Sequence, residues 1–174
     1  MSRRFRGESH HKVDTKGRVS IPASFRRVLE AGDPNWKNGD NPELVIVYGD
    51  QRRNYLECYT MEAIEEVDAK IDRMPRGSMQ RKALQRLFHG QSFPTTVDET
   101  GRLVLPAKLR NKIELNGEAF FIAAGDTFQI WKVSPAAIKN ASPLSSILLR
   151  SLAGSTKRPV SSTVVGKDWP WNRR

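Results

Sequence analysis

Short stretches of alternating apolar and polar residues recur along this chain and predict a fold of brief strands joined by turns and short helices. Apolar and polar side chains alternate strictly in residues 18–21, and residues 102–105 repeat the pattern except that Val104 makes both faces apolar. The proline that follows each stretch suits the first position of a helix. We expect strands at 18–21, 44–48, 55–59, 102–105, 120–124 and 128–133, and amphipathic helices at 23–29 and 107–113.

A helical pattern separates the two strand-rich parts. Apolar residues three or four positions apart line one face of residues 61–74, Pro-Arg-Gly at 75–77 interrupts the pattern, and a second apolar face follows at 79–88. We therefore expect a helical hairpin. The resulting organisation is a first domain at 1–60, the linking hairpin at 61–90, a second domain at 91–133 and a basic, mobile tail at 134–174.

The most informative pattern is a repeat. Residues 13–26 and 97–110 are identical at seven of 14 positions, and three further positions are apolar in both copies. Each copy opens with a four-residue turn that has Asp at its first and Gly at its fourth position, as in type I turns. Two copies of one supersecondary unit indicate a pseudo-two-fold relation, so what one hairpin tip presents, the other presents symmetrically.

Each tip pairs an aspartate with an arginine four positions later. One interpretation is an ion pair that only braces the turn, but an exposed pair contributes about 0 to 1 kcal/mol, a weak reason to build it twice. The other is that the aspartate orients a guanidinium whose fork remains free for phosphate oxygens or a guanine edge. The tip residues of this hypothesis are Asp14, Gly17, Arg18, Asp98, Gly101 and Arg102.

The charge of the chain favours a polyanionic partner. The net charge is +10, and the excess lies at the ends, because residues 1–30 carry +5, residues 31–133 carry −1 and residues 134–174 carry +6. We expect an N-terminal arm and the first tip to contact nucleic acid, and the tail to be either a further contact or only solvated chain. The basic residues of the arm and first tip are Arg3, Arg4, Arg6 and Lys16.

Other classes of function find less support. Cys58 is the single cysteine, the three histidines lack the spacing of a zinc site, and we expect no metal and no cofactor. The sequence shows no signal peptide and no run long enough to span a bilayer, so we expect a cytoplasmic protein. Symmetric aspartates near glycines suggest the shared-proton dyad of an aspartic protease, but the arginines favour ionised carboxylates. A nucleoid- or RNA-associated binder without sequence preference is the stronger alternative.

The doubled Asp-x-x-x-Arg hairpins, the segment Phe5-Arg6-Gly7-Glu8 and the Gly-Arg-hydrophobic-x-hydrophobic-Pro-Ala core resemble the MraZ family of bacterial transcriptional regulators. The resemblance covers about residues 5–133. It implies a mainly β fold with short helices, in which two pseudo-symmetric, swapped-hairpin halves of the SpoVT/AbrB type form one β-barrel-like core.

The resemblance also implies a function. It points to a sequence-specific, DNA-binding transcriptional regulator that assembles into a homo-oligomeric ring and is not an enzyme. Its partner would be double-stranded DNA at promoter direct repeats upstream of the division and cell-wall gene cluster, which places the protein in the cytoplasm, associated with the nucleoid. The motif of the family falls on the six tip residues named above, and Thr100 stands where the first copy has Lys16.

Overall fold

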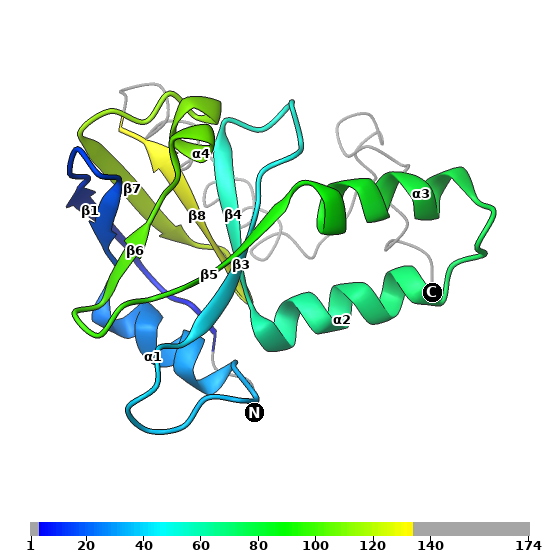
Figure 1. Ribbon diagram of the computed structural model, residues 1–174, viewed down its shortest axis with the longest axis horizontal. Helices are drawn as coiled ribbons and strands as arrows, with labels where there is room; N and C mark the ends of the chain where they lie inside the picture. Colours follow the sequence, from blue (N-terminus) through cyan, green and yellow to red (C-terminus); the bar gives the residue numbers. More distant parts are fainter. Residues whose placement is uncertain (1–3, 134–174) are drawn as a thin grey trace, which may run out of the picture. The chain divides into compact units, whose positions relative to one another are not determined.

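The computed structural model describes residues 4–133, and Figure 1 shows their arrangement. All of the expected strands and helices are present, although several begin or end one or two residues away from the sequence-based bounds and the second helix of the hairpin ends at Gln85, where a π-helical turn follows. In chain order the elements are β1 Glu8–Lys12, β2 Arg18–Ser20, α1 Ala23–Ala31, β3 Glu43–Val47, β4 Tyr55–Thr60, α2 Met61–Asp72, α3 Met79–Gln85, a π-helical turn Arg86–Gly90, β5 Ser92–Thr96, β6 Arg102–Val104, α4 Ala107–Lys112, β7 Glu118–Ala123 and β8 Thr127–Lys132. Arg3 and the tail at 134–174 lie outside the described residues.

The strands exchange between the two halves of the chain. Six antiparallel strands form a sheet in the order β1-β7-β8-β4-β3-β5, and β2 pairs with β6 in a separate two-stranded ribbon. The first half therefore lends β1 to the second half, where it pairs with β7, and the second half lends β5 to β3. Counted inward from the two edges, equivalent strands occupy the same positions: β1 matches β5, β7 matches β3 and β8 matches β4. This is the pseudo-two-fold relation expected from the repeat.

The six-stranded sheet is open. Its outermost strands are β1 and β5, which do not pair with each other in the described part of the chain. Directly after β1, Val13 forms one isolated antiparallel bridge with Val19 of the ribbon. The expectation of a barrel-like core is therefore not confirmed, whereas the mixed α+β fold with antiparallel sheets and short helices is confirmed. Pro94 in β5 fits this position, because proline cannot donate a ladder hydrogen bond and is tolerated at a sheet edge.

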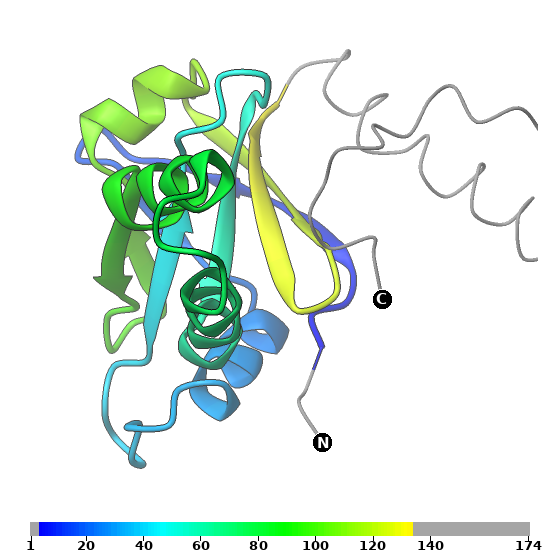
Figure 2. The same ribbon diagram turned by 90° about the vertical axis from the view of Figure 1, so that its right-hand side faces the viewer.

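One apolar core joins both halves. It lies between the large sheet, the ribbon and helices α1 and α4, and its largest fully buried side chains include Phe25, Phe121 and Phe128. A second cluster lies on the other face of the sheet, where α2 and α3 pack against β3 and β4 (Figure 2). Because the halves share the first core, neither half buries its apolar residues alone.

The helical hairpin follows its sequence signals closely. The Thr60 hydroxyl accepts a hydrogen bond from the Ala63 N–H at 3.1 Å, which caps α2, and the Ser78 hydroxyl accepts one from the Arg81 N–H at 3.2 Å, which caps α3. Helices α2 and α3 extend away from β1 and the ribbon in Figure 1. None of the helices in residues 4–133 is long and apolar enough to cross a membrane.

Candidate nucleic-acid interface

Both hairpin tips have the same backbone geometry. In the first, the Gly17 N–H donates to the Asp14 carbonyl at 2.9 Å and the Asp14 N–H donates to the Arg18 carbonyl at 3.0 Å. The second tip repeats these bonds between Gly101, Asp98 and Arg102, each at 2.8 Å. Both glycines have positive φ, +82° for Gly17 and +76° for Gly101, a conformation that favours glycine. The repeat therefore predicted both turns correctly.

Each aspartate holds the arginine of its own tip. Arg18 Nε donates to Asp14 Oδ2 at 2.6 Å, and Arg102 Nε donates to Asp98 Oδ2 at 3.1 Å. Within residues 4–133, the terminal nitrogens Nη1 and Nη2 of these two arginines make no hydrogen bond, and the side chains are 39% and 38% exposed. The guanidinium groups are thus oriented through Nε, and their terminal nitrogens are not used by hydrogen bonds within the described residues. This geometry agrees with the orienting role expected for the aspartates. Both arginine side chains are also exposed enough to contact a ligand.

Both aspartates have a lowered pKa in this setting. Asp14 Oδ1 accepts the N–H groups of Lys16 and Arg18, and the Arg18 N–H is the main cause of the lowered pKa of Asp14. At the second tip the Thr100 hydroxyl donates to Asp98 Oδ1 at 2.7 Å and, with the N–H of Arg102, lowers the pKa of Asp98 to about 2. Two carboxylates that are both ionised cannot share a proton, which argues against the protease dyad.

The ribbon brings the two arginines onto one face. Strands β2 and β6 pair with Arg18 opposite Val104 and Ser20 opposite Arg102, while Val19 and Leu103 point into the core. The arginines are therefore diagonal neighbours, with Cα atoms about 7 to 8 Å apart. Bonds from Leu105 N–H to the Gly17 carbonyl (2.8 Å) and from Ile21 N–H to the Gly101 carbonyl (2.9 Å) extend the ladder from each strand into the tip of the other. We call the outward face of Arg18, Ser20, Arg102 and Val104 the arginine ribbon.

Two further arginines support the tips, and sequence reasoning gave them no role. Arg110 in α4 donates from Nε to the Leu105 carbonyl at 3.0 Å and lies beside Gly17, while Arg26 in α1 lies beside Gly101. Each thus packs against the tip of the other half. Both occupy the last position of the 14-residue repeat, so their identity in the two copies was the signal that could have assigned them.

The N-terminal arm lies away from the first tip. Phe5 is 3% exposed, contacts the rings of Phe25 and Phe128, and donates its N–H to the Gly125 carbonyl at 2.8 Å. Arg4 and Arg6 are exposed on either side of it. The five-residue strand β1 then runs roughly 17 Å before the first tip begins. The structure therefore brings Lys16 and Arg18 together but holds the arm at the opposite end of β1.

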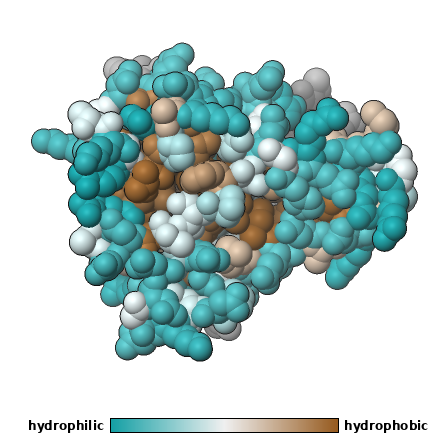
Figure 3. Space-filling view, in the orientation of Figure 1, coloured by the Kyte–Doolittle hydropathy of each residue, from teal (hydrophilic) through white to brown (hydrophobic). Residues whose placement is uncertain are grey.

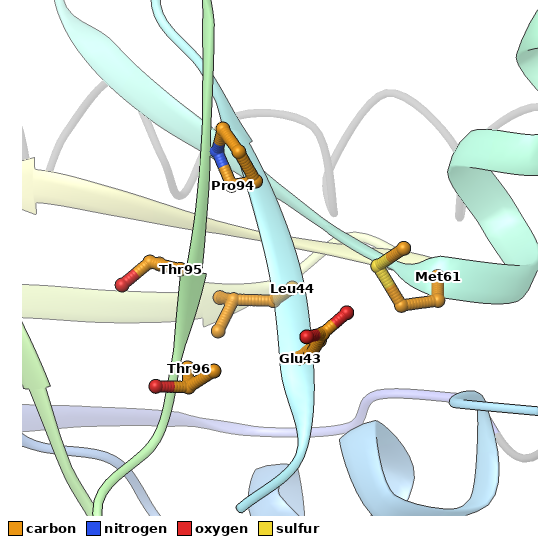
Figure 4. Close-up of a pocket in the computed structure, with 6 residues that line it drawn as sticks. All are labelled: Glu43, Leu44, Met61, Pro94, Thr95 and Thr96. Carbon is orange, nitrogen blue, oxygen red and sulfur yellow. The ribbon is translucent and has the colours of Figure 1, made fainter. Parts of the chain in front are cut away.

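The face of the described residues in Figure 3 also carries apolar and uncharged surface. Apolar side chains gather over the middle of the face in Figure 3, between β6 and β3, with hydrophilic side chains around them. A shallow hollow at the sheet edge is lined by one carboxylate and by apolar and hydroxyl side chains, with Pro94 of β5 above Leu44 of β3 (Figure 4). It contains no cationic residue and does not suit a polyanion. Its lining residues are Glu43, Leu44, Met61, Pro94, Thr95 and Thr96.

The fold and the site define a class of protein in which two fused, strand-exchanged β-hairpin repeats present a pair of oriented arginines. A family model described as "MraZ protein, putative antitoxin-like" matches residues 4–87 and again residues 88–134. The chain belongs to the MraZ family, as its sequence motifs indicated.

Curated relatives in this family are named transcriptional regulator MraZ. The one from Ruegeria pomeroyi is 85% identical over 131 residues, which are 75% of this chain and 78% of the relative. The one from Cereibacter sphaeroides is 45% identical over 139 residues, 76% of this chain and 82% of the relative. The one from Gluconobacter oxydans is 33% identical over 166 residues, 93% of this chain and 94% of the relative. The family is one of regulators and not of enzymes.

Proposed function

We propose that this protein is a sequence-specific, DNA-binding transcriptional regulator. The observation that carries the proposal is the arginine ribbon, in which each guanidinium is held through Nε and its terminal nitrogens form no hydrogen bond within the described residues. A two-stranded β-ribbon fits the major groove of B-DNA, and an arginine fork binds guanine O6 and N7 or clamps a phosphate. The names of the relatives support the same role. Lys16 adds a phosphate contact at the first tip, and Arg3, Arg4 and Arg6 add contacts from the arm.

One subunit contributes too little free energy for promoter specificity. A bidentate arginine–guanine contact discriminates by about 1 to 3 kcal/mol. A specific complex needs about 4 to 10 kcal/mol over non-specific binding. We therefore propose a homo-oligomeric ring in which each subunit places its arginine ribbon on one copy of a short direct repeat. Joined subunits gain effective concentration only where the repeat spacing matches the spacing of the ribbons.

The proposed target is the promoter region upstream of the division and cell-wall gene cluster, and the proposed location is the cytoplasm, on the nucleoid. Bound protein regulates by occupying the promoter, without catalysis. Within a subunit, we propose that residues 1–60 and 91–133 act as one DNA-binding body linked by 61–90, because each half supplies an edge strand to the other.

The test begins with footprinting on the DNA upstream of the protein's own gene, which reports the site, the number of repeats and their spacing. Binding of that DNA is then measured for Arg18→Ala, Arg102→Ala and Arg52→Ala. Arg52 is the control, because it is also paired with an aspartate, through Nε to Asp50 Oδ1 at 3.1 Å and through Nη2 to Asp50 Oδ2 at 3.2 Å, but lies on the β3–β4 loop away from the ribbon.

We expect each ribbon substitution to weaken specific binding by about tenfold or more, as loss of a bidentate contact requires. The folding midpoint should be nearly unchanged, because exposed ion pairs contribute little. Arg52→Ala should bind within about twofold of the wild type. A large fall in the folding midpoint of Arg18→Ala would favour the turn-brace interpretation. An equal loss of binding in Arg52→Ala would favour general charge attraction.

The alternative, a binder without sequence preference, is separated by competition. For a specific regulator, bulk unrelated DNA should displace the labelled promoter far less readily than unlabelled promoter does. Changing the repeat spacing by half a helical turn should also sharply weaken binding, because the ribbons then face the wrong side of the duplex. Equal binding to respaced sites would contradict the ring.

A further inference from the structure

The arginine ribbon is symmetric in charge but not at its centre. The pseudo-two-fold exchanges Arg18 with Arg102 and Ser20 with Val104. The arginines are identical, whereas the second pair sets a hydroxyl against an isopropyl group. Val104 is 48% exposed, although its chain neighbours Leu103 and Leu105 are fully buried. One half of the ribbon therefore presents an apolar group to solvent where the other half presents a polar one.

Strand formation alone does not explain this valine. β-Branched residues favour strands, but the equivalent strand forms with serine at the same position. Among the described residues, the other large apolar side chain exposed to this degree is Met79, at the start of α3 and far along the chain from the ribbon. Val104 lies directly opposite Arg18 and two residues from Arg102. A ligand that engages both guanidinium groups must therefore cover it.

The chemistry of such a ligand follows from its two requirements. It must offer acceptors to two arginines and an apolar group between them. Phosphates and ribose offer no apolar group of this kind, but the major groove of DNA does, because thymine presents its C5-methyl there. We propose that Val104 contacts a thymine C5-methyl within the short repeat that the arginine ribbon binds. This inference rests on the proposed function and adds a base preference to it.

The asymmetry has a consequence for the binding site. Ser20 faces the pseudo-symmetric position and offers a hydroxyl instead of a methyl contact, so the two halves of the ribbon favour different bases. The sequence bound by one subunit is then not palindromic, despite the two-fold arrangement of the arginines. Consecutive subunits related by rotation consequently read copies in the same direction.

The experiment uses the full chain and the footprinted repeat, in which each thymine in turn is replaced by deoxyuridine. This change removes one methyl group and leaves every hydrogen-bonding atom in place. We expect one position per repeat at which the wild type loses about fourfold in affinity, the equivalent of one buried methyl-sized group. In Val104→Ser this sensitivity should disappear. Val104→Thr retains one methyl and should keep part of it.

Ser20→Val provides the matched variant. It should create a second uracil-sensitive position, related to the first by the pseudo-two-fold, with the folding midpoint unchanged because the site is exposed. Tight, specific binding with no uracil-sensitive thymine overturns the inference and leaves the proposed function standing. Sensitivity that persists in Val104→Ser, or a change of subunit number as its main effect, also overturns the inference. Failure of the wild type to prefer any promoter sequence overturns both.

Discussion

Alanine substitutions at the two tip glycines should have unequal effects, although the glycines occupy equivalent positions. Both have positive φ, which costs an L-residue about 1 to 2 kcal/mol. A Cβ at Gly17 would lie 2.3 Å from the Leu105 carbonyl oxygen, a backbone atom that also accepts from Arg110. A Cβ at Gly101 would lie 2.6 Å from Arg26 Nη1, the end of a flexible side chain that can move aside.

The magnitudes follow from what must move. Gly101→Ala should lower the free energy of unfolding only by the cost of a positive φ, about 1 to 2 kcal/mol. Gly17→Ala must also separate β6 from the first tip and so lose the bond between Leu105 N–H and the Gly17 carbonyl, at about 1 to 3 kcal/mol more when a buried partner is left unsatisfied. For a chain of this size each kcal/mol lowers the folding midpoint by roughly 2 to 4 °C.

Urea denaturation and thermal melts at one fixed protein concentration measure this difference. We expect Gly17→Ala to be less stable than Gly101→Ala by more than about 1 kcal/mol. DNA binding by Gly17→Ala should also fall, because the displaced strand carries Arg102. Equal destabilisation of the two variants, or a greater effect at Gly101, would refute the claim that the Leu105 carbonyl beside Gly17 is fixed whereas the Arg26 side chain beside Gly101 can move aside.

Two further changes test the second tip and the arm. Thr100→Val removes the hydroxyl that donates to Asp98, so the pKa of that carboxyl should rise from about 2 towards its ordinary value. NMR titration of the carboxyl carbon measures this pKa. An unchanged pKa would show that Thr100 does not stabilise the carboxylate. Because the pKa of Asp98 is lower in the folded protein, its ionised carboxylate stabilises the fold at pH values above the unfolded-state pKa, and this stabilisation is lost as pH falls through about 2. The titration of Asp98 should therefore not change the free energy of unfolding of the wild type between pH 5 and 8. Phe5→Ala opens a cavity beside Phe25 and Phe128 and should cost about 3 to 5 kcal/mol by denaturant unfolding, whereas a cost below about 1 kcal/mol would contradict the anchoring of the arm.

The local parts of the fold were predictable because their signals lie within a few residues. Asp and Gly at fixed turn positions, the prolines that start α1 and α4, and the apolar face of α2 each gave the correct element. The same holds for the tip site, since Asp14 and Arg18 are four residues apart and pair within one turn. Repetition of that spacing at Asp98 and Arg102 likewise predicted the second pair, whereas the binding role of the two tips stays a prediction.

The strand exchange was not predictable from the residues themselves. β1 and β5 have mostly polar sequences, ESHHK and SFPTT, and as edge strands they bury only part of one face. Their partners are more than 40 residues away in sequence, and no local pattern encodes that choice. The sequence Gly-Asp follows β3 at 49–50 and β7 at 125–126, and matching these two turns would align Leu44 with Phe120. The sheet register instead makes Val45 equivalent to Phe120, because Val45 lies opposite Tyr59 and Phe120 lies opposite Trp131.

Carrying both exchange partners on one polypeptide has an evolutionary consequence. A unit that completes its sheet with an identical copy must present the same side chains twice, since any substitution appears on both sides of the axis. Here the connection through α2 and α3 makes the two copies distinct positions in one gene. Each can then mutate alone, as Lys16 against Thr100 and Ser20 against Val104 illustrate. Covalent joining thus turns a symmetric scaffold into one whose two sides are free to specialise.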